Sequence, residues 1–529
     1  MTKPPMILSP NCTKFLLDNE VYSFSAVCVL IRGNPSENLK LKRDQSDSQV
    51  LYVTGDSSIF KGLHEQDVVL LSDMSFLVKH IAAFLHNSKL QLMEGRTGTS
   101  VMPVFDHATE EQCAAASGIL NSPYTYVWGP PGAGKTTHVL VPCAAELLRA
   151  GKRVILAAPT NITADTALMN VLDLLGEEAR QHIVRLGVPT RELLESYPVV
   201  CEKQERKKGM EVPETWAEPF MKCLKEAVLV CGTVDTLIWQ LLPNIEDFQP
   251  DQIIIDEAAY TSLAKVLPFL AAGVPLALLG DHKQLLPVCE MANDKRIYKL
   301  ENAAACLWTV SAYYLETALA CNSITDFAEC CFGQQSLQKP TCFSEFRLTV
   351  SFRYGKKLAG VLSECVYDGQ FFGSTACGTE ILVVDRGKER GVSEQKRTSW
   401  KEVQAVSAYL NCYGAEQSCA VLTPYRNQKN LLQQILTNVP VMTVHKAQGQ
   451  EWNTVIFSVV DDEDKWFTDS LNRHTSGLNV INTAVSWAKK RLVIVCDVGY
   501  WSSQPHQLLA KLISVGKTIP YKAMKRRNR

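Results

Sequence analysis

A glycine-rich segment, GPPGAGKTT at residues 129–137, constrains the fold of this chain more than any other feature. It follows the short apolar stretch TYVW and precedes the apolar, helix-like pattern HVLVPCAAELL. Glycines let backbone N–H groups turn inward around a phosphate at the start of a helix, Lys135 reaches the terminal phosphates, and the Thr136 hydroxyl binds magnesium. A plain Gly/Pro turn that caps a helix is the alternative. The pattern predicts a P-loop that binds a nucleoside triphosphate through Gly129, Pro130, Pro131, Gly132, Ala133, Gly134, Lys135, Thr136 and Thr137.

Composition excludes several other classes of protein. The chain has 529 residues, of which 46% are hydrophobic and 21% charged, so roughly three to four folded domains are expected. Its 54 basic and 55 acidic residues leave a net charge of -1, and a nucleic-acid partner would therefore need local basic clefts. The longest apolar stretch, at residues 266–279, is too short for a bilayer and contains Pro268 and Pro275. With no signal-peptide pattern, the chain is expected to be intracellular, cytoplasmic or nuclear, and without a membrane segment.

Two patterns divide the chain. Residues 1–105 contain β-rich segments such as VYSFSAVCVLIRG followed by a helical pattern, which predicts a small β-rich accessory domain, a barrel with a helical connector. From residue 106, short apolar runs alternate with helical segments, as expected for parallel sheets in α/β domains. We expect one α/β domain at residues 106–340, with a polar insertion near 176–227, and a second at 341–515. A basic tail follows at 516–529.

Acidic and amide side chains follow two further apolar runs. QIIIDEAA places Asp256 and Glu257 at the carboxyl end of a buried strand, where Asp256 would hold Mg²⁺ and Glu257 would polarise the attacking water. LALLGDHKQLLP repeats the arrangement, and the Gln284 amide can sense a γ-phosphate through hydrogen bonds. Taken alone, the first pair is more often a solvent-exposed strand end, and the second segment a polar turn. Together with the P-loop they predict hydrolysis of the triphosphate.

Eight segments in order resemble the successive motifs of superfamily 1 helicases: GPPGAGKTT, AAPTNITAD, IIIDEAA, GDHKQLLP, LTVSFRY, VLTPYRNQ, TVHKAQGQEWNTVIFS and NTAVSWAKKRLVIV. The resemblance covers roughly residues 106–500 and is strongest to the branch of the nonsense-mediated-decay helicase, nidovirus helicases and their bacterial relatives. It implies two tandem RecA-like P-loop domains, parallel sheets flanked by helices, with ATP and Mg²⁺ in a cleft between them. It also implies ATP-driven movement along single-stranded RNA or DNA in the 5′ to 3′ direction. The β-rich segment at residues 1–105 is a candidate surface for a protein partner.

The resemblance assigns adenine and nucleic-acid contacts in the first domain. Gln112 of ATEEQ matches the adenine-reading glutamine, although Thr109 and Gln112 also form the pattern of a helix capping box. Short polar groups at strand ends contact nucleic-acid phosphates in this family, and the matching positions are Pro159, Thr160, Asn161 and Thr233. Threonine and asparagine at strand ends would otherwise cap helices.

In the second domain, Arg353 of SFRY matches an arginine that enters the ATP cleft. A guanidinium suits this role because it stays charged and forks onto phosphate oxygens, whereas a salt bridge is the alternative. The resemblance therefore assigns catalytic roles to Lys135, Glu257, Gln284 and Arg353. Gly449 and Glu451 lie where the family couples the nucleotide sugar and phosphates to the track. The positions that match nucleic-acid-facing strand ends are Thr423, Pro424, Tyr425, Arg426, Thr443 and His445.

One position departs from the family pattern. In NTAVSWAKK the family has an arginine where this chain has Trp487, and that arginine supplies a second cation to the γ-phosphate. Three interpretations stay open: the contact is lost, Lys490 or Arg491 replaces it from a similar helix face, or the indole packs in the domain core. If the contact is lost, the chain would be an ATP-gated nucleic-acid clamp or scaffold with weak turnover.

Overall fold

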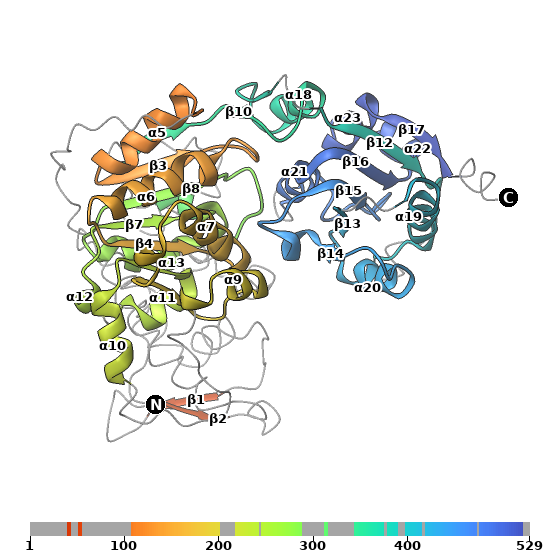
Figure 1. The fold of residues 1–529 in the computed structure, drawn as a ribbon. Helices are drawn as coiled ribbons and strands as arrows, with labels where there is room; N and C mark the ends of the chain where they lie inside the picture. Colours follow the sequence, from red (N-terminus) through yellow and green to blue (C-terminus); the bar gives the residue numbers. More distant parts are fainter. Residues whose placement is uncertain are drawn as a thin grey trace. The chain divides into compact units, whose positions relative to one another are not determined.

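The computed structural model describes most of the chain from residue 107 onward, namely residues 107–200, 217–242, 245–287, 311–315, 343–374, 378–389, 397–414, 418–472 and 476–521 (Figure 1). It also describes the backbone of two antiparallel strands, β1 (Lys40–Arg43) and β2 (Leu51–Thr54). The rest of the domain predicted for residues 1–105, residues 201–216 of the insertion and residues 522–529 of the predicted tail lie outside these ranges. The start of the predicted tail at residue 516 is wrong, because residues 517–520 form a strand that pairs with the second sheet. In the part of the chain described, no helix is both long and apolar enough to cross a bilayer.

The described residues form two compact units. The first contains residues from 107 to 346, except Trp128–Lys135 and Asp281–Leu286, which belong to the second unit together with residues 347–521. The glycine-rich segment is therefore divided: residues 129–135 belong to the second unit, and residues 136–137 belong to the first. We describe each unit separately.

The first unit is built on a sheet with the strand order β5, β6, β4, β7, β8, β3, β9. The pairs β5 with β6, β6 with β4, β4 with β7 and β7 with β8 are parallel. Most of these strands are buried at every position, as expected when helices cover both faces of a parallel sheet. The strands are β3 (Tyr124–Trp128), β4 (Val154–Ala158), β5 (Ile183–Leu186), β6 (Leu229–Thr233), β7 (Gln252–Ile255), β8 (Leu276–Gly280) and β9 (Ser344–Arg347).

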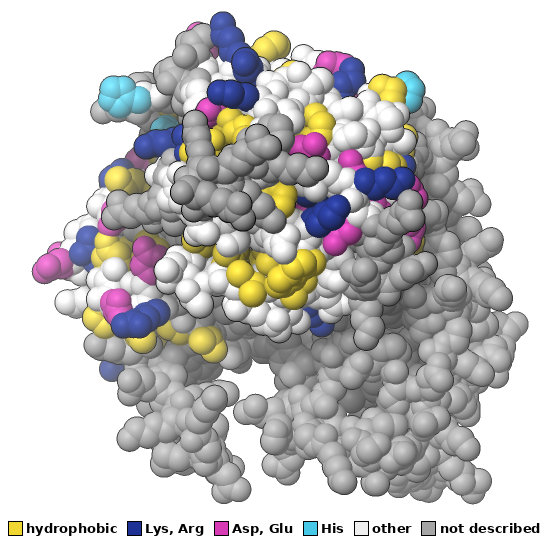
Figure 2. Space-filling model, turned by 90° about the vertical axis from the view of Figure 1, so that its right-hand side faces the viewer, with side chains coloured by type: hydrophobic (Ala, Val, Ile, Leu, Met, Phe, Trp, Pro, Cys, Tyr) yellow, Lys and Arg dark blue, Asp and Glu magenta, His cyan; other side chains and the backbone are white. Residues whose placement is uncertain are grey.

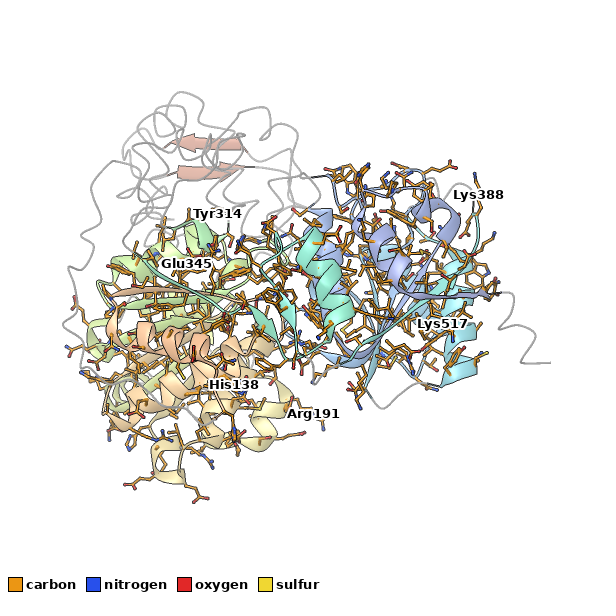
Figure 3. The ribbon with its side chains drawn as sticks, turned by 90° about the horizontal axis from the view of Figure 1, so that it is seen from above. His138, Arg191, Tyr314, Glu345, Lys388 and Lys517 are labelled. Atoms are coloured by element: carbon orange, nitrogen blue, oxygen red, sulfur yellow. The ribbon has the colours of Figure 1, made fainter. Side chains whose placement is uncertain are left out.

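Helices alternate with these strands along the chain (Figure 1). A π-helical turn, η1 (Lys135–Leu140), leads into α6, and Arg191 on α9 projects from the edge of the unit (Figure 3). The helices are α5 (Glu110–Asn121), α6 (Val141–Arg149), α7 (Asn161–Asp173), α8 (Glu177–Arg180), α9 (Arg191–Ser196), α10 (Ala217–Glu226), α11 (Val234–Gln240), α12 (Ile245–Phe248) and α13 (Leu263–Ala271). Apolar side chains of the strands and of α11 and α13 form the core of the unit.

The second unit is built on a sheet with the strand order β14, β13, β15, β16, β12, β17, in which all neighbouring strands are parallel. Lys517 begins the edge strand β17, where a charged side chain discourages pairing with another chain (Figure 3). The strands are β12 (Glu380–Asp385), β13 (Cys419–Thr423), β14 (Val441–Thr443), β15 (Trp452–Ser458), β16 (Ala488–Cys496) and β17 (Lys517–Pro520). The predicted α/β fold with parallel sheets flanked by helices is confirmed in both units.

The helices of the second unit again alternate with strands (Figure 1). They are α18 (Lys356–Cys365), α19 (Trp400–Tyr413), α20 (Arg426–Ile435), α21 (Gly477–Ser486), α22 (Val498–Ser502) and α23 (Leu508–Val515). A short parallel pair, β10 (Val350–Ser351) and β11 (Phe372–Gly373), precedes the main sheet. On the face drawn in Figure 2, basic and acidic side chains are interspersed, in keeping with the near-zero net charge.

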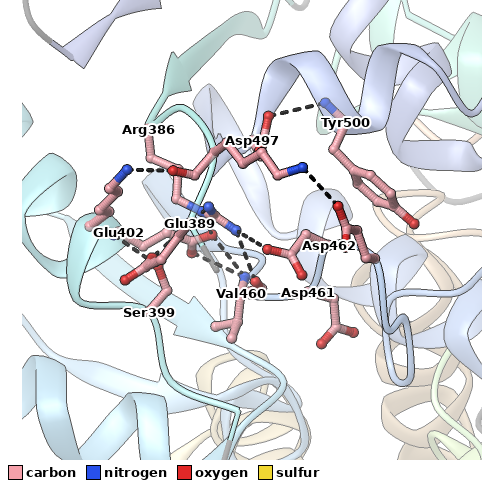
Figure 4. A network of polar contacts seen from close by, with 12 residues as sticks. Arg386, Glu389, Ser399, Glu402, Val460, Asp461, Asp462, Asp497 and Tyr500 are labelled. Carbon is pink, nitrogen blue, oxygen red and sulfur yellow. Dashed lines mark hydrogen bonds and ion pairs between the residues drawn. The ribbon is translucent and has the colours of Figure 1, made fainter. Parts of the chain in front are cut away.

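A buried ionic network lies at the carboxyl ends of β12 and β15 of this sheet (Figure 4). Arg386 follows β12, and its guanidinium donates to Glu402 of α19 at 3.0 Å and to Asp462 after β15 at 3.3 Å. Glu402 also accepts from the Ser458 hydroxyl at 2.6 Å and from the Val460 amide. Burial raises the pKa of Glu402 to about 7, against the opposing effect of Arg386 and the other donors. Because this value exceeds the ordinary 4.5, Glu402 stabilises the fold less as the pH rises from 4.5 to about 7.

The substitution Arg386→Leu should lower the free energy of unfolding by about 3–5 kcal/mol, because it leaves buried carboxyl groups without their cation. The loss should be smaller at acidic than at neutral pH, since Glu402 then takes a proton. Denaturant titration measures both effects. Arg491→Leu is the matched control, because Arg491 pairs with Glu380 at the surface and should cost about 1 kcal/mol or less. Equal losses in the two variants would contradict a stabilising role for the network.

Candidate functional site

The P-loop backbone folds around its own lysine. Lys135 is only 7% exposed, and its ammonium group donates to the carbonyl oxygens of Gly129 at 2.5 Å and Pro130 at 3.5 Å. Gly132 and Gly134 have φ angles of 78° and 81°, in the left-handed region that favours glycine. The two glycines therefore permit the sharp turns that the sequence pattern predicts.

In the first unit, Thr136 and Asp256 meet at the carboxyl end of β7. The Thr136 hydroxyl donates to the Asp256 carboxylate at 2.8 Å, and Asp256 is 1% exposed. A hydroxyl and a carboxylate oxygen are the ligand types that Mg²⁺ prefers, and proteins often supply only one or two of them beside substrate phosphates. In the described residues no group of three or more His, Cys, Asp and Glu side chains could hold a metal ion. The chemistry of the Thr136 hydroxyl and the Asp256 carboxylate fits magnesium.

Glu257 follows Asp256 in a strained backbone conformation. Its φ of 49° and ψ of 36° lie in the left-handed region, which a non-glycine residue adopts at a cost of about 1–3 kcal/mol. Its N–H donates to the Asp256 carboxylate at 2.9 Å, and a short 3₁₀ turn, η6 (Ala258–Tyr260), follows. Strain of this kind, held beside a carboxylate at a strand end, is typical of functional sites.

In the second unit, Asp281 is the centre of a buried hydrogen-bond network. Its carboxylate accepts from the Trp128 indole at 3.1 Å, the Tyr367 hydroxyl at 2.8 Å and the Gln284 amide at 3.2 Å. Burial raises the pKa of Asp281, and the Tyr367 hydroxyl in turn accepts from Asn482 of α21 at 2.8 Å. Gln284 is therefore held by a fully buried partner.

The Asp281 loop is also bonded directly to α21. Asn479 donates to the carbonyl of Gln284 at 2.6 Å, and Asn482 donates to the carbonyl of Lys283 at 2.9 Å. The Leu285 amide donates to the Thr483 hydroxyl at 3.0 Å. Three consecutive backbone groups of the loop are thus fixed by one helix.

Arg353 lies against the P-loop backbone. The Phe352 amide donates to the Gly132 carbonyl at 2.8 Å, and the Ser351 hydroxyl donates to the Pro131 carbonyl at 2.8 Å. A Cβ atom on Gly132 would approach the Arg353 Cβ to 2.4 Å, so this contact requires glycine. The position that the sequence singles out as catalytic is therefore adjacent to the loop that would hold the phosphates.

The Arg353 guanidinium has two partners in the second unit. It pairs with the Glu451 carboxylate at 2.8 Å and donates to the Ser486 carbonyl, the last residue of α21, at 3.2 Å. Lys489 forms a second ion pair with Glu451. Burial acts to raise the pKa of Glu451, but the two cations lower it overall. Glu451 is thus an ionised carboxylate shared by two cations.

The predicted placement of Lys490 and Arg491 on a helix face is wrong. Helix α21 ends at Ser486, and the residues after Trp487 form β16, so their side chains alternate between two faces of a sheet. Arg491 stands opposite Glu380 on β12 and pairs with it at 2.9 Å. Trp487 itself is 3% exposed and packs edge to face on Trp452, with ring centroids 6.1 Å apart. Of the three interpretations, the structure supports the core role of the indole.

Three of the residues predicted to contact adenine or nucleic acid in the first domain, Gln112, Thr160 and Thr233, take part in helix caps. Thr109 and Gln112 form a complete capping box at α5, with Gln112 2% exposed. Thr160 caps α7 and Thr233 caps α11, each through a side-chain hydrogen bond to a backbone amide. Asn161 accepts from Arg185 at 2.9 Å. Pro159, which precedes Thr160 in the chain, is partly buried.

The corresponding residues of the second domain lie at the carboxyl ends of neighbouring strands. Thr423 ends β13 and Thr443 ends β14, and the two residues are opposite each other in the sheet. Tyr425 is 6% exposed and its hydroxyl donates to Asp461, whereas Arg426 is exposed at the start of α20. His445 is partly buried, which lowers its pKa. Among the remaining predicted positions, Pro424 is buried, Ala133 is buried, Gly449 is exposed with φ of 79°, and Thr137 is exposed and bonded to His138 (Figure 3).

Comparison with known proteins assigns a family to these features. Two family models, both described as an AAA domain, match residues 107–215 and 194–291 for one model and residues 320–499 for the other. DNA polymerase alpha-associated DNA helicase A of Saccharomyces cerevisiae is 22% identical over 478 residues, 74% of this chain and 65% of that protein. The regulator of nonsense transcripts 1 homolog of Arabidopsis thaliana is 24% identical over 453 residues, 76% of this chain and 34% of that protein. The chain belongs to superfamily 1 of the helicases.

This superfamily 1 chain spans about two thirds of the first relative's length and about one third of the second's. The solved structure of PRRSV helicase is 17% identical, with a TM-score of 0.36, and the match covers 73% of this chain and 54% of that chain.

The structure adds residues to the superfamily 1 motifs that sequence reasoning missed. Tyr367 lies in no motif, and only its buried hydroxyl, bonded to Asp281 and Asn482, identifies it. Asn482 and Lys489 lie inside the block NTAVSWAKK, but the pattern does not show which of its polar side chains turn toward the site. A β period of two after Trp487 would have separated Lys489 from Lys490.

Proposed function

We propose that this chain is an ATP-dependent helicase or translocase that moves along single-stranded RNA or DNA in the 5′ to 3′ direction. The observation that carries the proposal is the hydrogen bonding of the Arg353 segment to the P-loop backbone. These bonds hold the backbone of Arg353 beside the phosphate-binding loop, and an arginine that enters a phosphate site from there can stabilise charge in phosphoryl transfer. Relatives whose names describe them as helicases support the same activity.

We assign the chemistry of the ATP site as follows. The P-loop amides and Lys135 hold the phosphates, and Thr136 with Asp256 holds Mg²⁺, which when bound neutralises charge on the phosphate oxygens. Glu257, whose carboxylate follows the magnesium ligand in the chain, orients the attacking water and accepts its proton. The Gln284 amide, fixed through Asp281, contacts the γ-phosphate. Gln112 contacts the adenine while keeping its role in the capping box.

Glu451 links the nucleotide to Arg353 and Lys489. Its carboxylate accepts from both cations. In this proposal the carboxylate also contacts the nucleotide sugar, and the two cations contact the phosphates when the nucleotide binds. Gly449 supplies the left-handed turn that precedes it. Lys489, rather than Lys490 or Arg491, is the candidate for the second phosphate cation, because it shares a carboxylate with Arg353.

The track lies along strand ends of both domains in this proposal. In the first domain the contacts are made by Pro159, Thr160, Asn161 and Thr233, and in the second by Thr423, Pro424, Arg426, Thr443 and His445. Such groups bind phosphates and fix register without reading bases. Tyr425 contributes through its backbone and through the placement of Arg426, because its ring is buried.

One observation favours a second candidate function. Trp487 is buried in the domain core where the family has an arginine, so in this proposal the second domain supplies Arg353 and Lys489 as its cations in place of that arginine. An ATP-gated clamp with weak turnover would follow if these two cations do not suffice. Steady-state ATPase rates with and without single strands separate the two functions. The helicase proposal predicts a rate that rises on adding single strands, whereas a clamp shows nucleotide-dependent strand affinity with an unstimulated rate.

The substitution Trp487→Arg should destabilise the protein by about 3 kcal/mol or more, because it removes a packed indole and buries a charge without a partner. It should not raise the strand-stimulated ATPase rate. Denaturant titration and ATPase assays measure the two effects. Trp400→Arg, at a 46% exposed position on α19, is the control and should be nearly neutral. A stable and faster Trp487→Arg protein would contradict the core role.

A further inference from the structure

The segment after β15 is folded around one buried carboxylate. Asp461 is 1% exposed and accepts from the Tyr425 hydroxyl, from the Trp466 amide at 3.0 Å and from the Thr468 hydroxyl at 2.7 Å. The Arg397 guanidinium pairs with the same carboxylate at 3.0 Å. The backbone of Trp466 is therefore held in place by a hydrogen bond to a buried carboxylate.

The Trp466 indole is nevertheless presented to solvent. It is 46% exposed, although its neighbour Phe467 packs inward. The ring centroids of Trp466 and Phe467 are 6.5 Å apart, and Phe467 lies 5.7 Å from Tyr425 and 6.4 Å from His445. A series of aromatic contacts thus connects the exposed indole to the ends of β13 and β14, where the track is proposed to lie.

The acidic residues of this segment do not make it a repulsive surface. Residues 461–464 are all acidic, but each forms an ion pair with a basic residue. Asp461 and Asp464 pair with Arg397, Asp462 pairs with Arg386, and Glu463 pairs with Lys388 at 2.9 Å. Three cations thus offset part of the charge of these four acidic residues, and the indole of Trp466 is 46% exposed beside them.

We propose that Trp466 is a stacking platform for a base of the single-stranded track. The inference rests on the proposed function, since it adds a contact to the same strand. An aromatic ring with a fixed backbone loses little entropy on binding, and stacking accepts every base because each has a π face. Trp466 thus supplies affinity that does not depend on charge, beside phosphate contacts such as Arg426.

Salt dependence distinguishes a stacking contact from a phosphate contact. Trp466→Ala should weaken binding of a single-stranded oligonucleotide by about 5- to 150-fold, the loss for one stacked base, and leave the slope of log Kd against log salt unchanged. Arg426→Ala should instead reduce the magnitude of that slope by about 0.7, because the loss of one phosphate contact means that fewer counterions are released on binding. Fluorescence anisotropy over a range of salt concentrations measures both.

Three variants make the test decisive. Trp400→Ala removes an indole of equal exposure from α19 and should not change affinity, whereas Trp466→Phe should keep most of it. Trp466→Ala is compared at a temperature where its fold is shown to be intact by denaturation. Equal affinity of Trp466→Ala and wild type, or an equal loss in Trp400→Ala, would overturn the stacking role. A wild-type protein that does not bind single strands would instead overturn the proposed function.

Discussion

Alanine in place of Lys135 should lower the rate of ATP hydrolysis by about a thousandfold or more, because a preorganised cation is removed from the transferring phosphate. The fold should survive, since the hydrogen bonds that Lys135 donates go to carbonyl oxygens of its own loop in the second unit. Steady-state phosphate release measures the rate, and circular dichroism checks the fold. ATP affinity should also fall, since the same lysine binds the ground state.

A surface lysine provides the control for this variant. Lys152 pairs with Asp251 and its side chain is 49% exposed, so Lys152→Ala should hydrolyse ATP at the wild-type rate. Hydrolysis at the wild-type rate in Lys135→Ala would show that the glycine-rich segment is not the phosphate site.

Alanine in place of Arg353 should lower kcat by about 10³- to 10⁵-fold, the range that an arginine contact to the transition state supplies. Binding of ATP should change far less, because the P-loop keeps its own contacts. Arg353→Lys should recover little activity, since an ammonium group lacks the forked geometry. Single-turnover rates and nucleotide titrations separate the two effects.

The neighbouring arginine is the matched control. Arg347 is exposed and bonded to Gln370 at 2.8 Å, so Arg347→Ala should retain kcat. If Arg353→Ala lost ATP affinity and kcat in equal proportion, or if it lost neither, the arginine would be structural and paired only with Glu451.

The sheets and the P-loop were predictable because their signals are local. A near-continuous apolar run such as QIII predicts a strand because a parallel sheet is buried on both faces. The glycines of the P-loop predict sharp turns, and two of them have a positive φ in the structure. The caps Thr160 and Thr233 follow from the same local rules.

Contacts between distant segments were not predictable. Tyr367 reaches Asp281 across 86 residues of sequence, and nothing in its own segment indicates this. The error at Lys490 and Arg491 has a simpler cause, because the helix of NTAVS ends at Ser486 and the period changes from helical to extended within one motif. Trp487 lies at that change, where neither period predicts the direction of a side chain.

Unwinding assays test the central claim most directly. The substrates are matched RNA and DNA duplexes that carry a single-stranded overhang at the 5′ or the 3′ end. The proposal predicts ATP-dependent strand separation from 5′ overhangs, absent in Lys135→Ala and with a non-hydrolysable nucleotide. Unwinding from 3′ overhangs only would contradict the direction. Tight nucleotide-dependent binding without any strand separation on either nucleic acid would contradict the helicase and leave the clamp.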